Sequence, residues 1–111
     1  MLAKYLWIAG AVPFIVFGVI HLAYTFFTNK FSSRNKNTDE SMKTSSPVLT
    51  KETTMWKAWI GFNASHSAGA IYIGLVNLIL AVEYFPVIKN PVFLFINITT
   101  VLCYLWLAKK F

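Results

Sequence analysis

The sequence predicts an all-α integral membrane protein with three membrane-spanning helices. Three stretches, at residues 6–27, 58–82 and 91–108, contain no Asp, Glu, Lys or Arg. At ~1.5 Å rise per residue, each stretch is about long enough to cross the ~30 Å hydrocarbon layer as a helix. The composition agrees, because a chain of 57% hydrophobic and only 13% charged residues has too little polar material to cover a soluble surface. We therefore expect one membrane domain over residues 1–111.

The first stretch is predicted to be a retained anchor. Its apolar run is longer than the core of a usual secretion signal, and no A-x-A-like cleavage site follows it. Tyr5 and Trp7 are aromatic residues of the kind that sit at the membrane interface. Pro13 removes a backbone donor and predicts a kink, which membrane helices tolerate when neighbours satisfy the freed carbonyl.

The segment between the first two spans, residues 28–55, is rich in Ser, Thr, Asn and Lys and is predicted to be a water-exposed connector. Ser46-Pro47 interrupts any continuous helix, because the residue before a proline avoids the α region. A short helix on either side of this point is compatible with the pattern. Thr53 and Thr54 are placed to cap the second span with their hydroxyl oxygens.

A short turn is predicted between the second and third spans, around Glu83 to Lys89. Asn90 followed by Pro91 is typical of a helix N-cap and first helical position. The third helix is then expected to run toward Lys109. Its Cys103 is the only cysteine, which excludes an internal disulfide and favours a small packing residue.

The basic residues predict the orientation. Eight of them fall on the connector and C-terminal side, namely Lys30, Arg34, Lys36, Lys43, Lys51, Lys57, Lys109 and Lys110, and only Lys4 and Lys89 fall on the other. Cytoplasmic loops near membrane helices carry an excess of Lys and Arg, so we expect the N-terminus outside and the C-terminus inside. This rule and anionic lipid headgroups account for the net charge of +6, and no nucleic acid is expected as a partner.

The two histidines are the most specific chemical feature. His21 lies six residues before Phe27, and His66 lies eight residues after Ala58, both counted from the connector side. At ~1.5 Å per residue the two imidazoles are expected at roughly 9 and 12 Å depth in the same leaflet. On neighbouring antiparallel helices they can approach each other or a shared ligand.

The second span is unusually small and polar near His66. Gly61, Ser65 and Gly69 are spaced four apart, a pattern that lets helix backbones approach closely. Asn63 and the neighbouring serines can hydrogen-bond across such a contact, and Tyr24 lies one turn from His21 on the first helix. We therefore expect a helix-packing surface here.

Three roles for the histidine pair remain open on sequence alone. In a structural role, neutral imidazoles hydrogen-bond to Asn63, Tyr24, Thr25 or each other and fix the helix register. In a cofactor role, His21 and His66 are the axial ligands of a b-type haem or line a quinone pocket. In a transport role, His66, Asn63, Asn77 and Glu83 are the steps of a polar path.

No enzymatic activity is predicted. Ser65 and His66 are neighbours in sequence, but adjacent helix residues point about 100° apart, and no acidic residue completes a triad. No third ligand lies at the level of the histidines, so no metal site is predicted.

A resemblance to a known family rests on two segments, FGVIHLAYTFF (17–27) and TTMWKAWIGFNASHSAGA (53–70). Over residues 1–84 the chain resembles a family of small bacterial polytopic membrane proteins, which usually have four helices. The resemblance implies a multi-helix fold in the bacterial inner membrane and draws attention to His21, Asn63, Ser65, His66 and Gly69. It implies no substrate, and three spans leave open whether this chain is a shortened or partial member.

Taken together, the sequence favours an accessory or oligomerising membrane subunit. Three helices enclose little interior volume, so a homo-oligomer or a place in a larger membrane complex is expected. The predicted contact surface is the small and polar face of the second helix.

Overall fold

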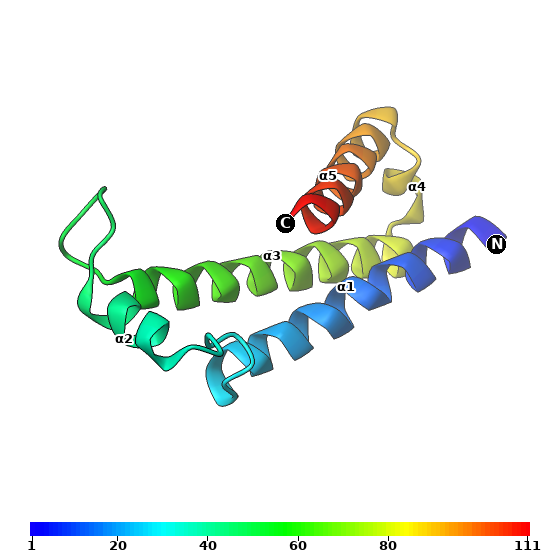
Figure 1. Cartoon of the computed structure of the whole chain (residues 1–111). Coiled ribbons are helices and arrows are strands. Elements are labelled where there is room, and N and C mark those ends of the chain that lie inside the picture. The colour runs from blue at the N-terminus through cyan, green and yellow to red at the C-terminus, as the bar shows by residue number, and fades with distance from the viewer.

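The computed structural model describes residues 1–111 and contains helices but no strands (Figure 1). In chain order the elements are α1 (Leu2–Phe27), α2 (Lys36–Thr44), α3 (Met55–Glu83), α4 (Phe85–Ile88) and α5 (Pro91–Lys110). α1, α3 and α5 are long and apolar enough to cross a membrane, with mean hydropathies of 2.1, 1.6 and 1.9 over their best windows. The predicted all-α class with three candidate spans is confirmed.

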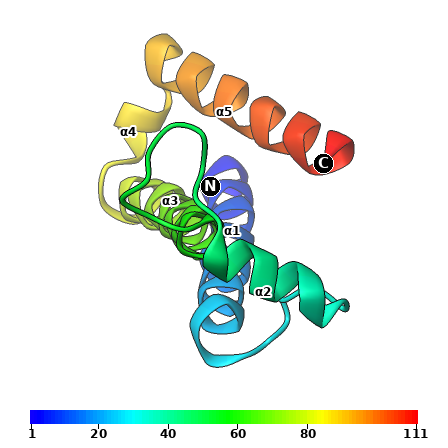
Figure 2. The ribbon, with the colours of Figure 1, turned by 60° about the vertical axis from the view of Figure 1, so that its left-hand side comes forward.

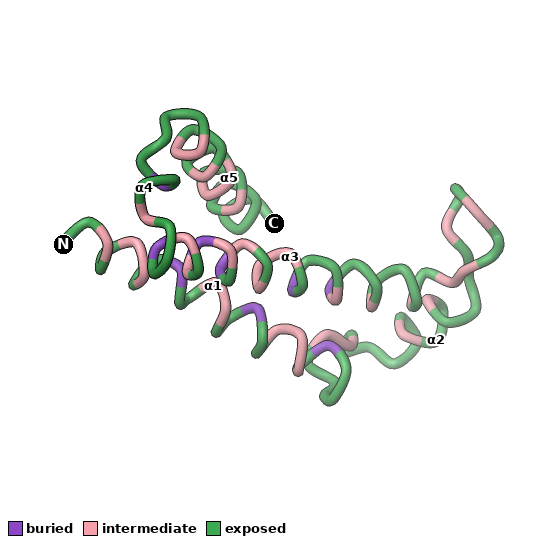
Figure 3. The backbone as a smooth tube through the Cα atoms, turned by 180° about the vertical axis from the view of Figure 1, so that it is seen from behind, coloured by how far each residue is buried: buried purple, intermediate pink, exposed green.

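α1 and α3 form an antiparallel pair that contains nearly all of the buried residues (Figures 1 and 3). The buried positions recur at spacings of seven residues on α1 and of three, four or seven residues on α3, as is typical of helices that pack along a shared seam. On α1 they are Ala11, Gly18 and Thr25, and on α3 they are Asn63, Ser67, Gly74, Asn77 and Ala81. The core is therefore a narrow line of small and polar side chains between two helices.

The backbones of the two helices are in close contact at Gly18 and Gly74. A Cβ atom added to Gly18 would lie 3.1 Å from the backbone nitrogen of Ile71 and 2.7 Å from its Cγ1 atom. A Cβ added to Gly74 would lie 3.0 Å from the backbone nitrogen of Ile15 and 2.6 Å from its Cγ1 atom. Both helices carry the pattern Ile-x-x-Gly, from Ile15 to Gly18 on α1 and from Ile71 to Gly74 on α3. Each glycine packs against the isoleucine of the other helix, so the two contacts are reciprocal.

The helix ends follow the predicted caps. The Thr54 hydroxyl accepts a hydrogen bond from the Lys57 backbone N–H at 3.2 Å, and the Asn90 side chain accepts one from Val92 at 2.9 Å. These side chains satisfy donors that a helix start leaves unpaired. Pro91 takes the first helical position of α5, where a missing N–H costs nothing.

The connector is tied back to α3. It contains α2, which begins after the Asn35 cap and ends before Pro47, as the proline predicts. Near the end of α1 the Phe31 carbonyl accepts a hydrogen bond from the Trp59 indole N–H at 3.0 Å. The Met55 N–H donates to the Ser45 carbonyl at 2.8 Å. The predicted short turn after α3 also contains one helical turn, α4.

α5 is set apart from the α1–α3 pair. It follows α4 and crosses beside the pair, as Figure 2 shows, and none of its residues is buried. It contacts the pair through Tyr104, whose ring lies 6.3 Å from that of Phe14 on α1 and 5.5 Å from that of His66 on α3. The third helix therefore leaves most of its surface open.

Candidate functional site

The structure brings the two histidines together, as their depths predict. His21 on α1 and His66 on α3 have ring centroids 5.7 Å apart, with the ring planes at 66°. Tyr104 of α5 lies against the other side of His66. The three membrane-spanning helices therefore meet at this pair, which we call the histidine cluster: His21, His66, Asn63 and Tyr104.

Within the cluster, His21 is fixed by Asn63. The Asn63 amide nitrogen donates to the Trp59 carbonyl at 2.9 Å, which leaves the amide oxygen facing His21. The Nε2 atom of His21 is 3.0 Å from that oxygen and therefore donates to it. Asn63 is only 4% exposed, so this hydrogen bond is shielded from competing partners. Phe31 covers the imidazole with a ring-centroid distance of 4.4 Å.

His66 is bound much less firmly. It is exposed, it makes no hydrogen bond within the chain, and its ring lies 6.2 Å from that of Phe62 and 5.5 Å from that of Tyr104. A polar group at this depth is costly in hydrocarbon unless it finds a partner. The two histidines are thus unequal: His21 is a satisfied packing residue, and His66 has hydrogen-bonding capacity to spare.

A haem held between the two histidines does not fit this arrangement. Axial ligation by both would require a flat macrocycle to pass between α1 and α3, with one nitrogen of each ring facing the iron. The His21 Nε2 atom is bound to Asn63, and one turn away an added Gly18 Cβ would lie 3.1 Å from the Ser67 carbonyl oxygen. The backbones leave no gap for such a group.

The other predicted site residues lie around the cluster. Ser65 is exposed and donates to the Phe62 carbonyl at 3.0 Å, and Gly61 has open space where a Cβ would point. Gly69 faces α5, because an added Cβ would lie 3.4 Å from the Tyr104 hydroxyl. Tyr24 is exposed, with the Lys30 ammonium 5.9 Å from its ring. The small-residue line on α3 therefore faces away from α1.

A second polar link joins α1 and α3 nearer the other end of the pair. The Trp7 indole N–H donates to the Asn77 amide oxygen at 2.9 Å, and the Asn77 amide nitrogen donates to the Ile73 carbonyl at 2.9 Å. This is the arrangement of His21 with Asn63: an aromatic N–H on α1 meets an asparagine on α3 that is anchored one turn back. Sequence reasoning placed Trp7 only at the interface. On antiparallel helices that place His21 opposite Asn63, Trp7 falls opposite Asn77. This correspondence along the two helices is the sequence signal that identifies the second link.

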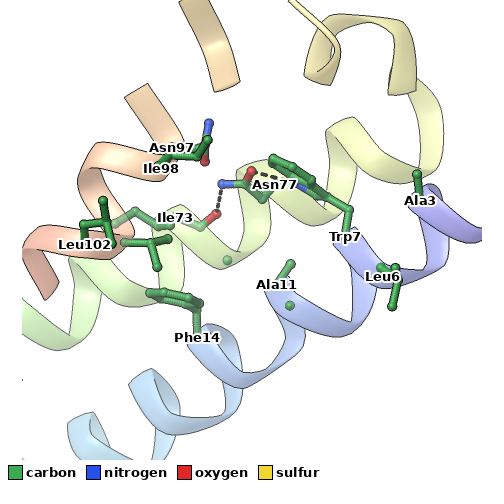
Figure 4. A pocket seen from close by; sticks show the side chains of 13 residues that line it. Ala3, Leu6, Trp7, Ala11, Phe14, Ile73, Asn77, Asn97, Ile98 and Leu102 are labelled. Carbon is green, nitrogen blue, oxygen red and sulfur yellow. Dashed lines mark hydrogen bonds between the residues drawn. The ribbon is translucent and has the colours of Figure 1, made fainter. Parts of the chain in front are cut away.

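A cavity of about 580 Å³ lies beside this second link, between α1, α3 and α5 (Figure 4). Most of its lining is apolar, and the residues are Ala3, Leu6, Trp7, Gly10, Ala11, Phe14, Ile73, Gly74, Asn77, Asn97, Ile98, Val101 and Leu102. Neither histidine is among them. Sequence reasoning did not foresee this cavity, because it depends on how α5 leans across the pair.

The fold and these contacts define an integral membrane protein built on one antiparallel helix pair, with a third candidate span packed loosely against it. Comparison of the chain with known protein families, with curated proteins and with solved structures gave no match. Function is therefore argued from the geometry alone.

Proposed function

We propose that this protein is an assembling membrane subunit, which associates with a second copy of itself through α5 and the adjoining face of α3. The observation that supports this most is the state of α5: it is long and apolar enough to span the bilayer, yet none of its residues is buried. A helix that packs so little within its own chain is free to pack against another.

The chemistry of the open surface suits helix association in lipid. Membrane helices associate through close packing of small residues and through polar contacts, since burial of apolar surface gives no advantage there. Gly61 and Ser65 provide an open small-residue line beside the unpaired His66. Thr99 on α5 is also exposed at membrane depth. A second copy would supply partners for these groups in a self-complementary contact.

Cys103 allows a direct test. It is the only cysteine and lies exposed on α5, so oxidation of native membranes can report whether two α5 helices meet. Because disulfides need Cα atoms within about 4.4–6.8 Å, we would move a single cysteine along residues 99–106 in a Cys103→Ser background. We expect cross-linked dimers with helical periodicity. Uniformly absent cross-linking would contradict the proposal.

A matched pair of variants links this surface to His66. With the cysteine that cross-links best in place, His66→Ala is expected to lower the dimer yield several-fold, because it removes the polar group beside the small-residue line of Gly61 and Ser65. Phe26→Ala removes an exposed aromatic residue from α1, 58% exposed, and should leave the yield unchanged. Equal yields in all three chains would exclude a role for His66.

We also propose that the connector and C-terminus face the cytoplasm of a bacterial cell and that the chain lies in the inner membrane. The excess of Lys and Arg on the connector side supports this orientation. In the Cys103→Ser background, a cysteine at exposed Val87 should react with a membrane-impermeant maleimide in intact cells. A cysteine at exposed Leu49 should react only after lysis, and the reverse pattern would invert the topology.

A further inference from the structure

The cavity between α1, α3 and α5 combines an apolar wall with polar groups deep in the membrane. Asn77 lies six residues before the end of α3 at Glu83, and Asn97 lies six residues after the start of α5 at Pro91. At ~1.5 Å per residue both carboxamides are roughly 9 Å inside the same end of the molecule. Both line the cavity, and Figure 4 shows them on facing sides of it.

The two carboxamides retain unused hydrogen-bonding capacity. The Asn77 amide oxygen accepts from Trp7, and one of its two N–H groups donates to Ile73, so one N–H is left over. One Asn97 N–H donates to the Phe93 carbonyl at 3.0 Å, which leaves its second N–H and its oxygen. The two asparagines that line the cavity therefore retain two N–H donors and one acceptor at a single depth.

This depth argues against an ordinary lipid tail as the intended occupant. Phospholipid polar groups lie at the interface, so an acyl chain in the cavity would leave the remaining N–H group of each carboxamide and the Asn97 oxygen without a partner in hydrocarbon, which is costly. A ligand that satisfies them must carry carbonyl or hydroxyl groups within the apolar layer. Trp7 and Phe14 supply aromatic walls of the kind that bind a flat ring.

We propose that this cavity binds a membrane-soluble quinone. Its ring carbonyls would accept from the free N–H groups of Asn77 and Asn97, and its apolar tail would lie along the remaining lining. The volume of about 580 Å³ is within the roughly 300–1,000 Å³ common for ligand pockets. The inference does not depend on the proposed assembly, because every lining residue belongs to one chain.

Fluorescence of Trp7 provides the test. In the full chain carrying Trp56→Phe, Trp59→Phe and Trp106→Phe, Trp7 is the only tryptophan and lines the cavity. A matched chain that retains only Trp59, which lies outside the cavity, reports quenching by quinone dissolved in the detergent micelle. Titration with a short-chain ubiquinone should quench Trp7 along a saturating curve and Trp59 only in proportion to concentration.

Two variants and one analogue decide the chemistry. Asn97→Leu should weaken binding at least tenfold, whereas Thr100→Val on the same helix, outside the cavity, should not change it. An alkylbenzene with the same tail but no carbonyl should compete at least tenfold less well than the quinone. The proposal would be overturned if quenching of Trp7 were merely proportional to quinone concentration, or if Asn97→Leu bound the quinone with unchanged affinity. Equal competition by the alkylbenzene would also overturn it, because the site would then be a purely apolar one for lipid tails. Loss of saturable quenching in cross-linked dimers would also overturn the proposal, because a helix of the second copy would then occupy the cavity.

Discussion

Gly18→Ala is expected to destabilise the protein, whereas Gly61→Ala is expected to stabilise it slightly. At Gly18 the new methyl group would lie 2.7 Å from Ile71 Cγ1 and 3.1 Å from backbone atoms of both Ile71 and Ser67, and backbone cannot move aside as a flexible side chain can. Overpacking of this kind costs about 1–3 kcal/mol. At Gly61 nothing lies within 4 Å, so the gain in helix propensity of up to about 1 kcal/mol remains.

The measurement is thermal or denaturant unfolding of the purified chains in one detergent, at a protein concentration low enough to keep them monomeric. Gly74→Ala should behave like Gly18→Ala, because its methyl group would meet Ile15 and the Ala11 carbonyl in the reciprocal contact. Gly18→Leu should abolish the native helix pair. Equal stabilities for Gly18→Ala and Gly61→Ala would show that α1 and α3 do not meet as described.

The two histidines are expected to differ sharply in their contribution to stability. Asn63→Leu should destabilise the chain by about 1–3 kcal/mol, because it leaves the part-buried His21 N–H without its acceptor. His66→Phe should change the stability of the monomer by less than about 0.5 kcal/mol, since His66 makes no hydrogen bond within the chain.

A double-mutant cycle isolates the His21–Asn63 hydrogen bond. Comparing His21→Phe, Asn63→Leu and the double variant should give a coupling free energy of about 0.6–1.7 kcal/mol, between the average and the maximum found for polar contacts between membrane helices. The same cycle for His66 and Asn63 should give no coupling. A larger effect at His66 than at His21 would reverse the roles assigned to them.

Much of this architecture was predictable from the sequence because its strongest signals are local. The absence of charge over long stretches predicts the spans, and Thr54 and Asn90 cap helices through their own side chains. The shared depth of His21 and His66 follows from counting residues along two helices. These inferences need no knowledge of how a helix is rotated about its axis, whereas the contact between the two rings does depend on that rotation and is supplied by the structure.

The face of α3 that packs against α1 was not predicted. α3 carries small residues on more than one side, and the sequence singled out the evenly spaced Gly61, Ser65 and Gly69 as a surface for assembly, which stays a prediction. The close contact between α1 and α3 uses Gly74 together with Gly18 of α1. Which small stripe meets a neighbour depends on complementary shapes in both helices, here an isoleucine opposite each glycine, and a pattern within one helix does not contain that information.

The reciprocal glycine contacts also have a mechanical consequence. A single point of contact would let two helices change their crossing angle about that point. Two contacts at different positions along the helices resist both a change in crossing angle and sliding of one helix along the other. The asparagine links at Trp7 and His21 brace the same pair on either side. α1 and α3 are therefore held together at four points along their length. α5 follows the short α4 segment and has no buried residue, so it is the element whose displacement would change both the width of the cavity and the distance between Tyr104 and His66.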